Sequence, residues 1–450
     1  MKNSIYEFEG EEFLKYDLIG SANVGIVSGY FLNSWIETDM PKFEVLSADI
    51  PKYSRKIFKD ERNIKFHISG YDEKFLNAFR RLNGETVERY ASIMAHTLVD
   101  ETKLIYSSIK ELKNNKKDFL SADFINVYSD KKIQEICLNV KGYSDSAFNE
   151  ETLVWWVELE NLLDKKQVYV PAQMFFIGFP SENRNEKKFV ASVSTGTASH
   201  NNYPNSLFNS LVELIQIHNF NLNWYYGCKS KRIIIDDFQM LNWIKEILTN
   251  VNEVELEYVL YQDQISDLCI VGCFAYTKDK KFPAISFGIQ ASTDATEAIK
   301  RATLECLSVF VSSYYSFIFQ SDSHYFKNEH VNFFANLDDN VLLYADAKNY
   351  VKNKIEIDKR IEGEISLRDL QRKWGRKNND KKEEVKMLFK SLKEKEVDVY
   401  AMDITPPEIK NITVVTRLWS PQLFPVFLPS MPYEKSSLIK NVFYYPHPLA

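Results

Sequence analysis

Two glutamates, Glu85 and Glu88, stand three residues apart in this sequence, and Arg89 follows directly after the second. The surrounding stretch is typical of the middle of a helix, in which residues three positions apart lie on the same face. Two carboxylates on one face repel each other, so a metal ion, a bound cation or an arginine must offset their charge. The pair therefore predicts either a cation site or a structural ion pair with an arginine.

The same unit occurs three times along the chain. Each copy has a short β-like run that ends near a glycine, then a polar loop, then a helix that carries a glutamate. The glutamates are Glu85, Glu213 and Glu305, the runs cover residues 65–70, 189–196 and 284–288, and Glu88, Gln216 and Ser308 stand three places after the glutamates. Glycines in loops and glutamates in helices are common, so chance similarity stays open beside a true repeat.

Composition limits the kind of protein that carries these units. The 450 residues, 45% of them apolar, allow two or three compact units or one large fused one. A net charge of −6 argues against a nucleic-acid partner. The five cysteines form no CxxC pair, which favours a reducing compartment over a disulfide frame. Without an apolar N-terminal segment or a membrane-spanning run, we expect a cytoplasmic protein with no membrane partner.

Familiar nucleotide and catalytic motifs are missing. Gly20 and Gly25 have the spacing of a P-loop, but Ile26 and Val27 stand where its lysine and hydroxyl residue belong. No GxGxxG, HExxH or GxSxG motif occurs. What remains is carboxylates on three helices with arginines nearby. Because Mg²⁺ prefers oxygen ligands and arginine binds phosphate, a magnesium–nucleotide site built from helix faces is coherent.

The remaining pattern predicts the elements that position these residues. We expect helices over 72–112, in two segments, and over 238–248, and a charged helical stretch over 366–396, in which a solvated surface is favoured over a docking face. Strands are predicted at 167–172, 254–261, 397–404 and 412–418, and an irregular connection at 320–365. Pro446 and Pro448 make the C-terminal tail stiff and extended, which favours presentation of its carboxylate into a cleft.

The chain resembles the YcaO family across nearly its whole length, and within it the azoline-forming cyclodehydratases, or D proteins, of thiazole/oxazole-modified microcins. The similar pieces, besides the proline-bearing tail, are residues 69–71, 84–90, 194–199, 213–217, 301–305 and 417–423. The resemblance implies an α+β YcaO fold whose repeated strand–loop–helix units form an ATP site without a P-loop. It divides the chain into an N-terminal part (1–64), the ATP-binding core (65–365) and a C-terminal helix and strand segment with the tail (366–450).

The resemblance also implies roles for single residues. It makes Glu85, Glu88, Glu213 and Glu305 the ligands of Mg²⁺ and part of the ATP site, and it gives Arg89, Gln216 and Arg301 the task of contacting ATP or ordering that site. By the same analogy the carboxylate of Ala450 acts as a general base, and Pro446 and Pro448 fix its path.

The implied activity is ATP-dependent cyclodehydration of Cys, Ser or Thr in a ribosomal precursor peptide, in bacteriocin- or cytolysin-type biosynthesis. Implied partners are the precursor peptide, an E1-like or ThiF-like scaffold protein that brings its leader, and a flavin dehydrogenase that oxidises the azolines. The oligomeric state stays open, with a homodimer as one alternative. Two alternatives stay open. One is a thioamide-forming YcaO enzyme, against which the proline tail argues, and the other is a non-catalytic scaffold subunit, against which the retained glutamates argue.

The sequence departs from the family pattern at four places. Arg81 stands where the family often has serine, and a lysine common beside the first glycine is missing next to Gly70. His218 stands where aspartate is frequent, and the tail ends Pro-His-Pro-Leu-Ala without a third proline. None of these differences removes one of the four glutamates.

Overall fold

The fold is taken from a computed structural model of the chain. The structure describes residues 19, 26–27, 30–33, 40–50, 67–180, 185–251, 253–319, 332–375, 380–436, 439 and 441–450. Gly20 and Gly25, considered above as a degenerate P-loop, lie outside these residues, as does most of segment 1–64. The described part mixes helices and strands, and the α+β class predicted from the sequence is confirmed.

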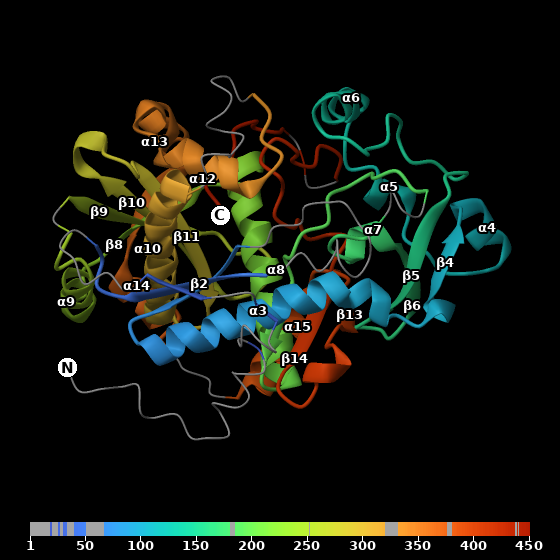
Figure 1. Ribbon diagram of the computed structural model, residues 1–450, viewed down its shortest axis with the longest axis horizontal. Coiled ribbons are helices and arrows are strands. Elements are labelled where there is room, and N and C mark those ends of the chain that lie inside the picture. The colour runs from blue at the N-terminus through green and yellow to red at the C-terminus, as the bar shows by residue number, and fades with distance from the viewer. Residues whose placement is uncertain are drawn as a thin grey trace.

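Three β-sheets build the frame of the described part (Figure 1). The first is antiparallel and runs β1 (Tyr30–Asn33), β2 (Glu44–Asp49), β3 (His67–Asp72). The second runs β4 (Leu104–Ser107), β5 (Val154–Asn161), β13 (Tyr400–Asp403), β14 (Val414–Trp419), β7 (Thr197–His200), with β6 (Gln167–Pro171) also paired to β5. The third runs β11 (Ile285–Ser292), β10 (Cys269–Thr277), β9 (Val254–Tyr261), β8 (Ser230–Ile234), β12 (Ile361–Ser366). All pairings are antiparallel except that of β8 with β12.

Three long helices pack on these sheets and form the centre of the molecule (Figure 1). They are α3 (Phe75–Leu98), α8 (Tyr203–Tyr226) and α10 (Ala295–Phe319). Helix α3 contacts β2 and β3, α10 contacts β10 and β11, and α8 lies between, touching β7 and β14 on one side and β11 on the other. These are the three helices that the sequence predicted from their glutamates.

Glycines allow two of these helices to touch their strands. A Cβ atom on Gly70 of β3 would stand 2.1 Å from the carbonyl oxygen of Ala78 in α3. A Cβ atom on Gly288 of β11 would stand 2.3 Å from the backbone nitrogen of Cys306 in α10. Only a residue without Cβ fits such an approach, which gives these two glycines of the repeat a packing reason.

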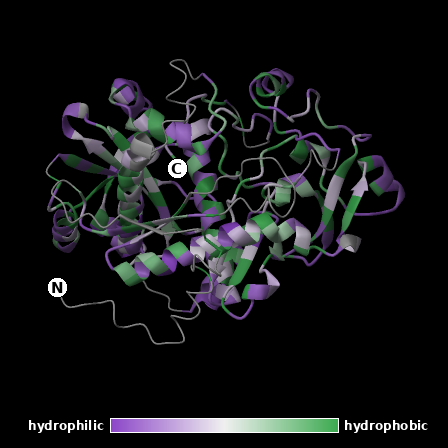
Figure 2. Ribbon diagram, in the orientation of Figure 1, coloured by the Kyte–Doolittle hydropathy of each residue, from purple (hydrophilic) through white to green (hydrophobic). Residues whose placement is uncertain are grey.

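Shorter helices complete the fold and lie mostly on its outside (Figure 1). They are α4 (Ile109–Asn114), α5 (Ala122–Ile125), α6 (Asp130–Asn139), α7 (Ala172–Phe175), α9 (Phe238–Ile247), α12 (Leu337–Ala345), α13 (Tyr350–Asp358), α14 (Leu367–Lys373) and α15 (Lys381–Glu394). In Figure 2 outer helices such as α13 carry more hydrophilic colour than the strands do. No described helix has the length and apolar character needed to cross a membrane.

Several predicted elements differ from the structure. Residues 189–196 are not a strand, because the run ends in a tight loop at Gly196 (φ +85°) and β7 begins only afterwards. Segment 337–366 is regular rather than irregular, since its Asn and Asp residues cap and open helices, as Asn336 does for α12. The predicted helical stretch 366–396 consists of two helices, α14 and α15. Strand β4 interrupts the predicted helical region 72–112.

Candidate functional site

Each of the three repeat glutamates accepts a hydrogen bond from the backbone of the strand or loop before its helix. Oε2 of Glu85 accepts from the N–H of Ser69 at 2.9 Å. Oε2 of Glu213 accepts from Gly196 at 3.2 Å, and Oε2 of Glu305 accepts from Ile289 at 3.0 Å. A carboxylate held by a backbone N–H has a fixed orientation, so the repeat seen in the sequence is also a repeat in side-chain geometry.

Arg89 neutralises much of the charge on α3. Its Nη1 lies 2.8 Å from Oε1 of Glu88, and its Nη2 lies 3.3 Å from Oε1 of Glu85. The three side chains are between 16% and 27% exposed, so solvent screens them only partly. The structural ion pair considered from the sequence is therefore present, and it leaves one more carboxylate than arginine on this face.

Burial shifts the carboxylates of the site toward their protonated forms. Burial raises the pKa of Glu88 to about 8, against the pull of Arg89 and with help from the charges of Glu213 and Glu85. Burial also raises the pKa of Glu213 to about 7, opposed first by Arg89. The helix carrying Glu213 therefore places its carboxylate within the electrostatic reach of the α3 group.

Glu305 joins this group from the third helix. Its Oε2 accepts a second hydrogen bond, from Nε2 of Gln290 at 2.9 Å. Burial raises its pKa to about 7 despite that bond, and the charge of Glu213 acts in the same direction. The three helices thus bring their glutamates close enough for their charges to interact. Such a concentration of buried negative charge favours a bound cation.

Arg301, one turn before Glu305, supplies an unused donor. Its Nε is buried and has no hydrogen-bond partner among the described residues. Burial lowers its pKa, and the neighbouring charge of Arg81 lowers it further. Arg81, one of the departures from the family pattern, pairs instead with Asp72 at 3.1 Å. An unpaired buried N–H next to a second arginine fits the binding of an anion such as phosphate.

The donors fit magnesium shared with phosphate better than a metal cage made by protein alone. No three Asp, Glu, His or Cys side chains among the described residues are grouped closely enough to hold a metal ion by themselves. Mg²⁺ usually takes one or two carboxylates and completes its octahedron with phosphate oxygens and water. Carboxylate oxygens beside an anion-binding arginine meet that requirement.

Gln216 connects two of the units. It is buried, and its Nε2 donates to the carbonyl oxygen of Ile289 at 3.1 Å. The N–H of the same Ile289 binds Glu305. One residue of β11, Ile289, is therefore held by α8 through its carbonyl oxygen and by α10 through its N–H. This arrangement favours the site-ordering role among the two that the sequence resemblance allowed.

The C-terminal tail runs against α8 and α12. The Tyr344 hydroxyl donates to the carbonyl oxygen of Pro446 at 2.8 Å, and Nδ2 of Asn340 donates to the carbonyl oxygens of His447 at 2.6 Å and Leu449 at 2.7 Å. Pro448 is buried and Ala450 is exposed at the end. In the view of Figure 1 the C-terminus appears beside the labels of α8, α12 and β11.

Sequence reasoning missed the residues that hold this tail. Asn340 and Tyr344 lie on α12, in the stretch expected to be irregular, and Trp224 of α8 donates from Nε1 to the carbonyl oxygen of Tyr445 at 2.9 Å. The contacts span more than 100 residues of sequence, so no local pattern indicated them.

His218, another departure, has a structural place. It is fully buried on α8, and its Nδ1 accepts a hydrogen bond from the N–H of Phe424 at 3.0 Å. Burial lowers its pKa to about 3, so the ring is neutral at physiological pH. A neutral ring cannot supply the negative charge that an aspartate would have there.

Comparisons with known proteins identify the family and the fold. The family profile described as YcaO cyclodehydratase, ATP- and Mg²⁺-binding, matches residues 70–423. No curated protein sequence matches the chain. A heterocyclase solved in complex with substrate and cofactor is similar in structure, with a TM-score of 0.69 and 14% sequence identity over 97% of this chain and 56% of that chain. This chain therefore spans little more than half the length of that heterocyclase.

Two other structures match over nearly their full lengths. YcaO from Methanopyrus kandleri, bound with AMPPCP and Mg²⁺, gives a TM-score of 0.61 at 14% identity, covering 94% of this chain and 95% of that one. A chain of the E. coli microcin synthetase McbBCD complex with pro-MccB17 bound gives 0.62 at 15% identity, covering 93% and 96%. At such identities the likeness establishes the fold, and the family profile covers most of the sequence. The chain belongs to the YcaO family of ATP- and Mg²⁺-binding cyclodehydratases.

Proposed function

We propose that this chain is an azoline-forming enzyme that acts on a ribosomally made precursor peptide. A Cys, Ser or Thr side chain of the peptide adds to the preceding amide carbonyl and forms a hemiorthoamide. ATP then phosphorylates the oxygen of that adduct, and phosphate leaves with this oxygen as the C=N bond of the ring forms. The products are a thiazoline or (methyl)oxazoline, ADP and phosphate. An amide oxygen is a poor leaving group and phosphate a good one, which is why the reaction needs ATP.

The observation that carries the proposal is the threefold fixation of Glu85, Glu213 and Glu305 by backbone N–H groups around one buried, negatively charged region. Three oriented carboxylates from three helices are costly to bury and contribute little to folding. Their retention supports a site that receives a cation with its nucleotide. Bound magnesium supplies charge neutralisation to the phosphates of ATP.

The chain's own residues then have separate tasks. In the proposed site Glu85, Glu88, Glu213 and Glu305 provide oxygen ligands, and the free Nε of Arg301 binds a phosphate oxygen. Arg89 keeps Glu85 and Glu88 in place until a cation competes for them. Gln216 orders β11 between α8 and α10. Oriented donors and charges of this kind stabilise a migrating phosphoryl group.

The tail has a second proposed task. Its anchoring by α8 and α12 supports a fixed position for the Ala450 carboxylate, which we propose as the general base that removes protons during ring closure. Pro446 and Pro448 stiffen the approach. Such a tail favours ring formation over the alternative of thioamide formation, because a positioned base serves nucleophiles that must lose a proton.

The proposed partners are the precursor peptide and an E1-like or ThiF-like scaffold protein that binds its leader. A flavin dehydrogenase that oxidises the rings and a homodimer complete the set. The similar microcin synthetase was solved as a complex with a pro-peptide bound, which supports the idea of partner subunits here. Five cysteines without a disulfide support action in a reducing compartment such as the cytoplasm.

The test combines phosphate release from ATP with mass spectrometry of a Cys/Ser/Thr-rich precursor peptide in the presence of the scaffold protein. We expect one phosphate for each loss of water from the peptide. Tight nucleotide binding with neither product would favour the alternative of a non-catalytic subunit. Sulfur incorporation in place of water loss would favour thioamide formation.

A further inference from the structure

The second glutamate unit lacks an arginine on its own helix. Helix α3 carries Arg89 next to its glutamates, and α10 carries Arg301 one turn before Glu305. Helix α8 contains no lysine or arginine in its 24 residues. If the negative charge of each unit is to be offset by an arginine, Glu213 needs one from another element of the fold.

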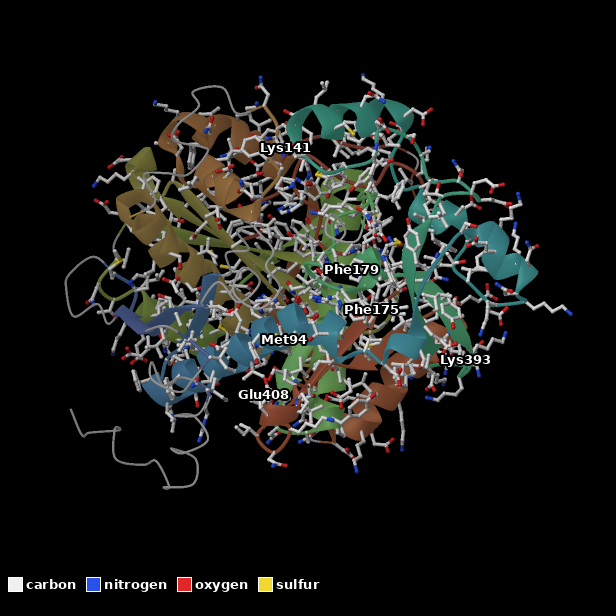
Figure 3. All side chains as sticks on the ribbon, turned by 45° about the vertical axis from the view of Figure 1, so that its right-hand side comes forward. Met94, Lys141, Phe175, Phe179, Lys393 and Glu408 are labelled. Atoms are coloured by element: carbon white, nitrogen blue, oxygen red, sulfur yellow. The ribbon has the colours of Figure 1, made fainter. Side chains whose placement is uncertain are left out.

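Arg417 of β14 occupies that place. Its side chain is 3% exposed and lies over the ring of Phe175, with Cζ 5.8 Å from the ring centroid. Figure 3 shows Phe175 near the centre of the molecule, close to Phe179. Arg417 is thus a cation in the interior, where a charge is tolerated only with partners that compensate its desolvation.

The hydrogen bonds of Arg417 enclose the loop that holds Glu213. Nη1 donates to the carbonyl oxygen of Thr195 at 2.7 Å and to Oγ1 of Thr197 at 2.9 Å, and Nε donates to the carbonyl oxygen of Phe175 at 3.1 Å. Between the two threonines stands Gly196, whose N–H binds Glu213. The guanidinium therefore binds the two residues that flank Gly196, whose N–H donates to Glu213.

The loop has little freedom to adapt without this grip. Gly196 has φ +85°, and a Cβ atom there would stand 2.6 Å from the carbonyl oxygen of Leu418, the residue after Arg417. The N–H of Leu418 donates to the carbonyl oxygen of Gly196 at 2.7 Å. The side chain of Arg417 and the backbone of Leu418 therefore fix the loop at Gly196, and the N–H of Gly196 fixes Glu213.

We propose that Arg417 is the arginine that the second unit takes from outside its own helix and a positioning residue of the nucleotide site, holding the Gly196 loop and, together with Arg89, offsetting the charge of Glu213. This inference rests on the proposed role of Glu213 in that site. Charge supports it independently of the hydrogen bonds: burial lowers the pKa of Arg417 to about 10, while Glu213 and Glu88 act to keep it protonated.

The first test measures the affinity of purified variants for Mg·AMPPCP by calorimetry, with thermal unfolding in parallel. Arg417→Gln removes the charge and most donors, and we expect affinity to fall about tenfold or more, because hydrogen bonds to a charged group are lost. Arg417→Lys keeps the charge without the forked geometry and should recover part of the affinity. The matched control is Arg360→Gln, since Arg360 is also buried but binds Glu356 and the Trp224 carbonyl. It should lower stability without weakening nucleotide binding.

Unchanged affinity in Arg417→Gln, with a loss of stability like that of Arg360→Gln, would overturn the inference. If Arg417→Gln does not fold, Thr197→Val takes its place, because it removes one acceptor of the guanidinium and keeps the side-chain volume. We expect Thr197→Val to weaken Mg·AMPPCP and Thr197→Ser to retain wild-type affinity, and equal affinities for the two would also overturn it.

The readout separates this inference from the proposed function. Binding of Mg·AMPPCP needs neither peptide nor partner protein. A wild-type chain that binds Mg·AMPPCP but never forms a ring would contradict the proposed reaction. The role of Arg417 could still be tested by comparing the affinities of the variants for Mg·AMPPCP. Where the wild type is active, Arg417→Gln should raise KM for ATP more than it lowers kcat.

Discussion

The first and third glutamate units share a scaffold but differ in charge. In both, a strand N–H fixes the glutamate, at 2.9 Å for Glu85 and 3.0 Å for Glu305, and in both a glycine brings helix and strand together. On α3, Arg89 forms ion pairs with Glu85 and Glu88 of the same helix. On α10, the buried Nε of Arg301 has no hydrogen-bond partner among the described residues. The same structural unit therefore serves two purposes. In the first unit an arginine neutralises the glutamates of its own helix, and in the third unit the arginine has a donor available for an anion.

The largest expected effect comes from changing Glu213, because its charge raises the pKa of Glu88 in the first unit and of Glu305 in the third. Glu213→Gln keeps the size of the side chain but not its charge, and we expect ATP turnover to fall at least about a hundredfold while the chain stays folded. Glu85→Ala and Glu305→Ala should do the same. Phosphate release and circular dichroism measure the two properties, and Glu246→Gln, 68% exposed on α9, is the control. Three active variants would remove the site assignment.

Exchanging the arginines tests the comparison directly. Arg301→Gln should raise KM for ATP about tenfold with little change in stability, because the buried Nε of Arg301 has no hydrogen-bond partner among the described residues to lose. Arg89→Gln leaves Glu85 and Glu88 without their partner and should lower the free energy of unfolding by about 1–3 kcal/mol. Urea denaturation and ATP kinetics give both values. The reverse ordering would mean that the two units do not differ as described.

Deleting the last two residues, Leu449 and Ala450, should spare Mg·ATP binding and impair ring formation. The deletion removes the proposed base while the glutamates stay in place. Calorimetry of nucleotide binding and mass spectrometry of the precursor peptide distinguish the two steps. Lost ATP affinity with intact chemistry would contradict the role given to the tail.

Glycine substitutions test the scaffold that the units share. Gly70→Ala and Gly288→Ala should each lower stability by about 1–3 kcal/mol, because a methyl group would overlap backbone atoms of α3 or α10. Gly84→Ala is the control within α3, since a Cβ there meets nothing within 4 Å. It should raise stability by up to about 1 kcal/mol, the usual gain over glycine inside a helix. Thermal unfolding ranks the three.

The last prediction concerns pH dependence. The carboxyl groups of Glu88, Glu213 and Glu305 have raised pKa values, about 8, 7 and 7, against 4.5 in an unfolded chain. The folded state then binds more protons than the unfolded state over this range, so stability without nucleotide should fall as pH rises from 5.5 to 8. A bound cation needs the deprotonated forms, so Mg·AMPPCP should raise Tm more at pH 8 than at pH 6. An equal rise at both values would contradict these shifts.

The sequence indicated the three helices and their glutamates, because spacing within one helix or one strand–helix unit is local information. The class of fold followed from the family resemblance. The sequence did not reveal the loop at Gly196, since the run before it has the β-branched residues of a strand while the chain actually turns there. Arg417 could not be assigned a role either. Its hydrogen bonds reach residues more than 200 positions away, and no local pattern records such a contact.

The burial of helix α8 affects how slowly the backbone around Glu213 opens to solvent. The helix lies between two sheets, and from Ser206 to Tyr225 only Asn209 is exposed and only Glu213 is half-buried. Amide protons around Glu213 should therefore exchange with solvent only when the whole molecule unfolds, whereas those of the exposed helix α13 should exchange through local opening. The candidate site would then be kinetically protected for as long as the fold itself survives.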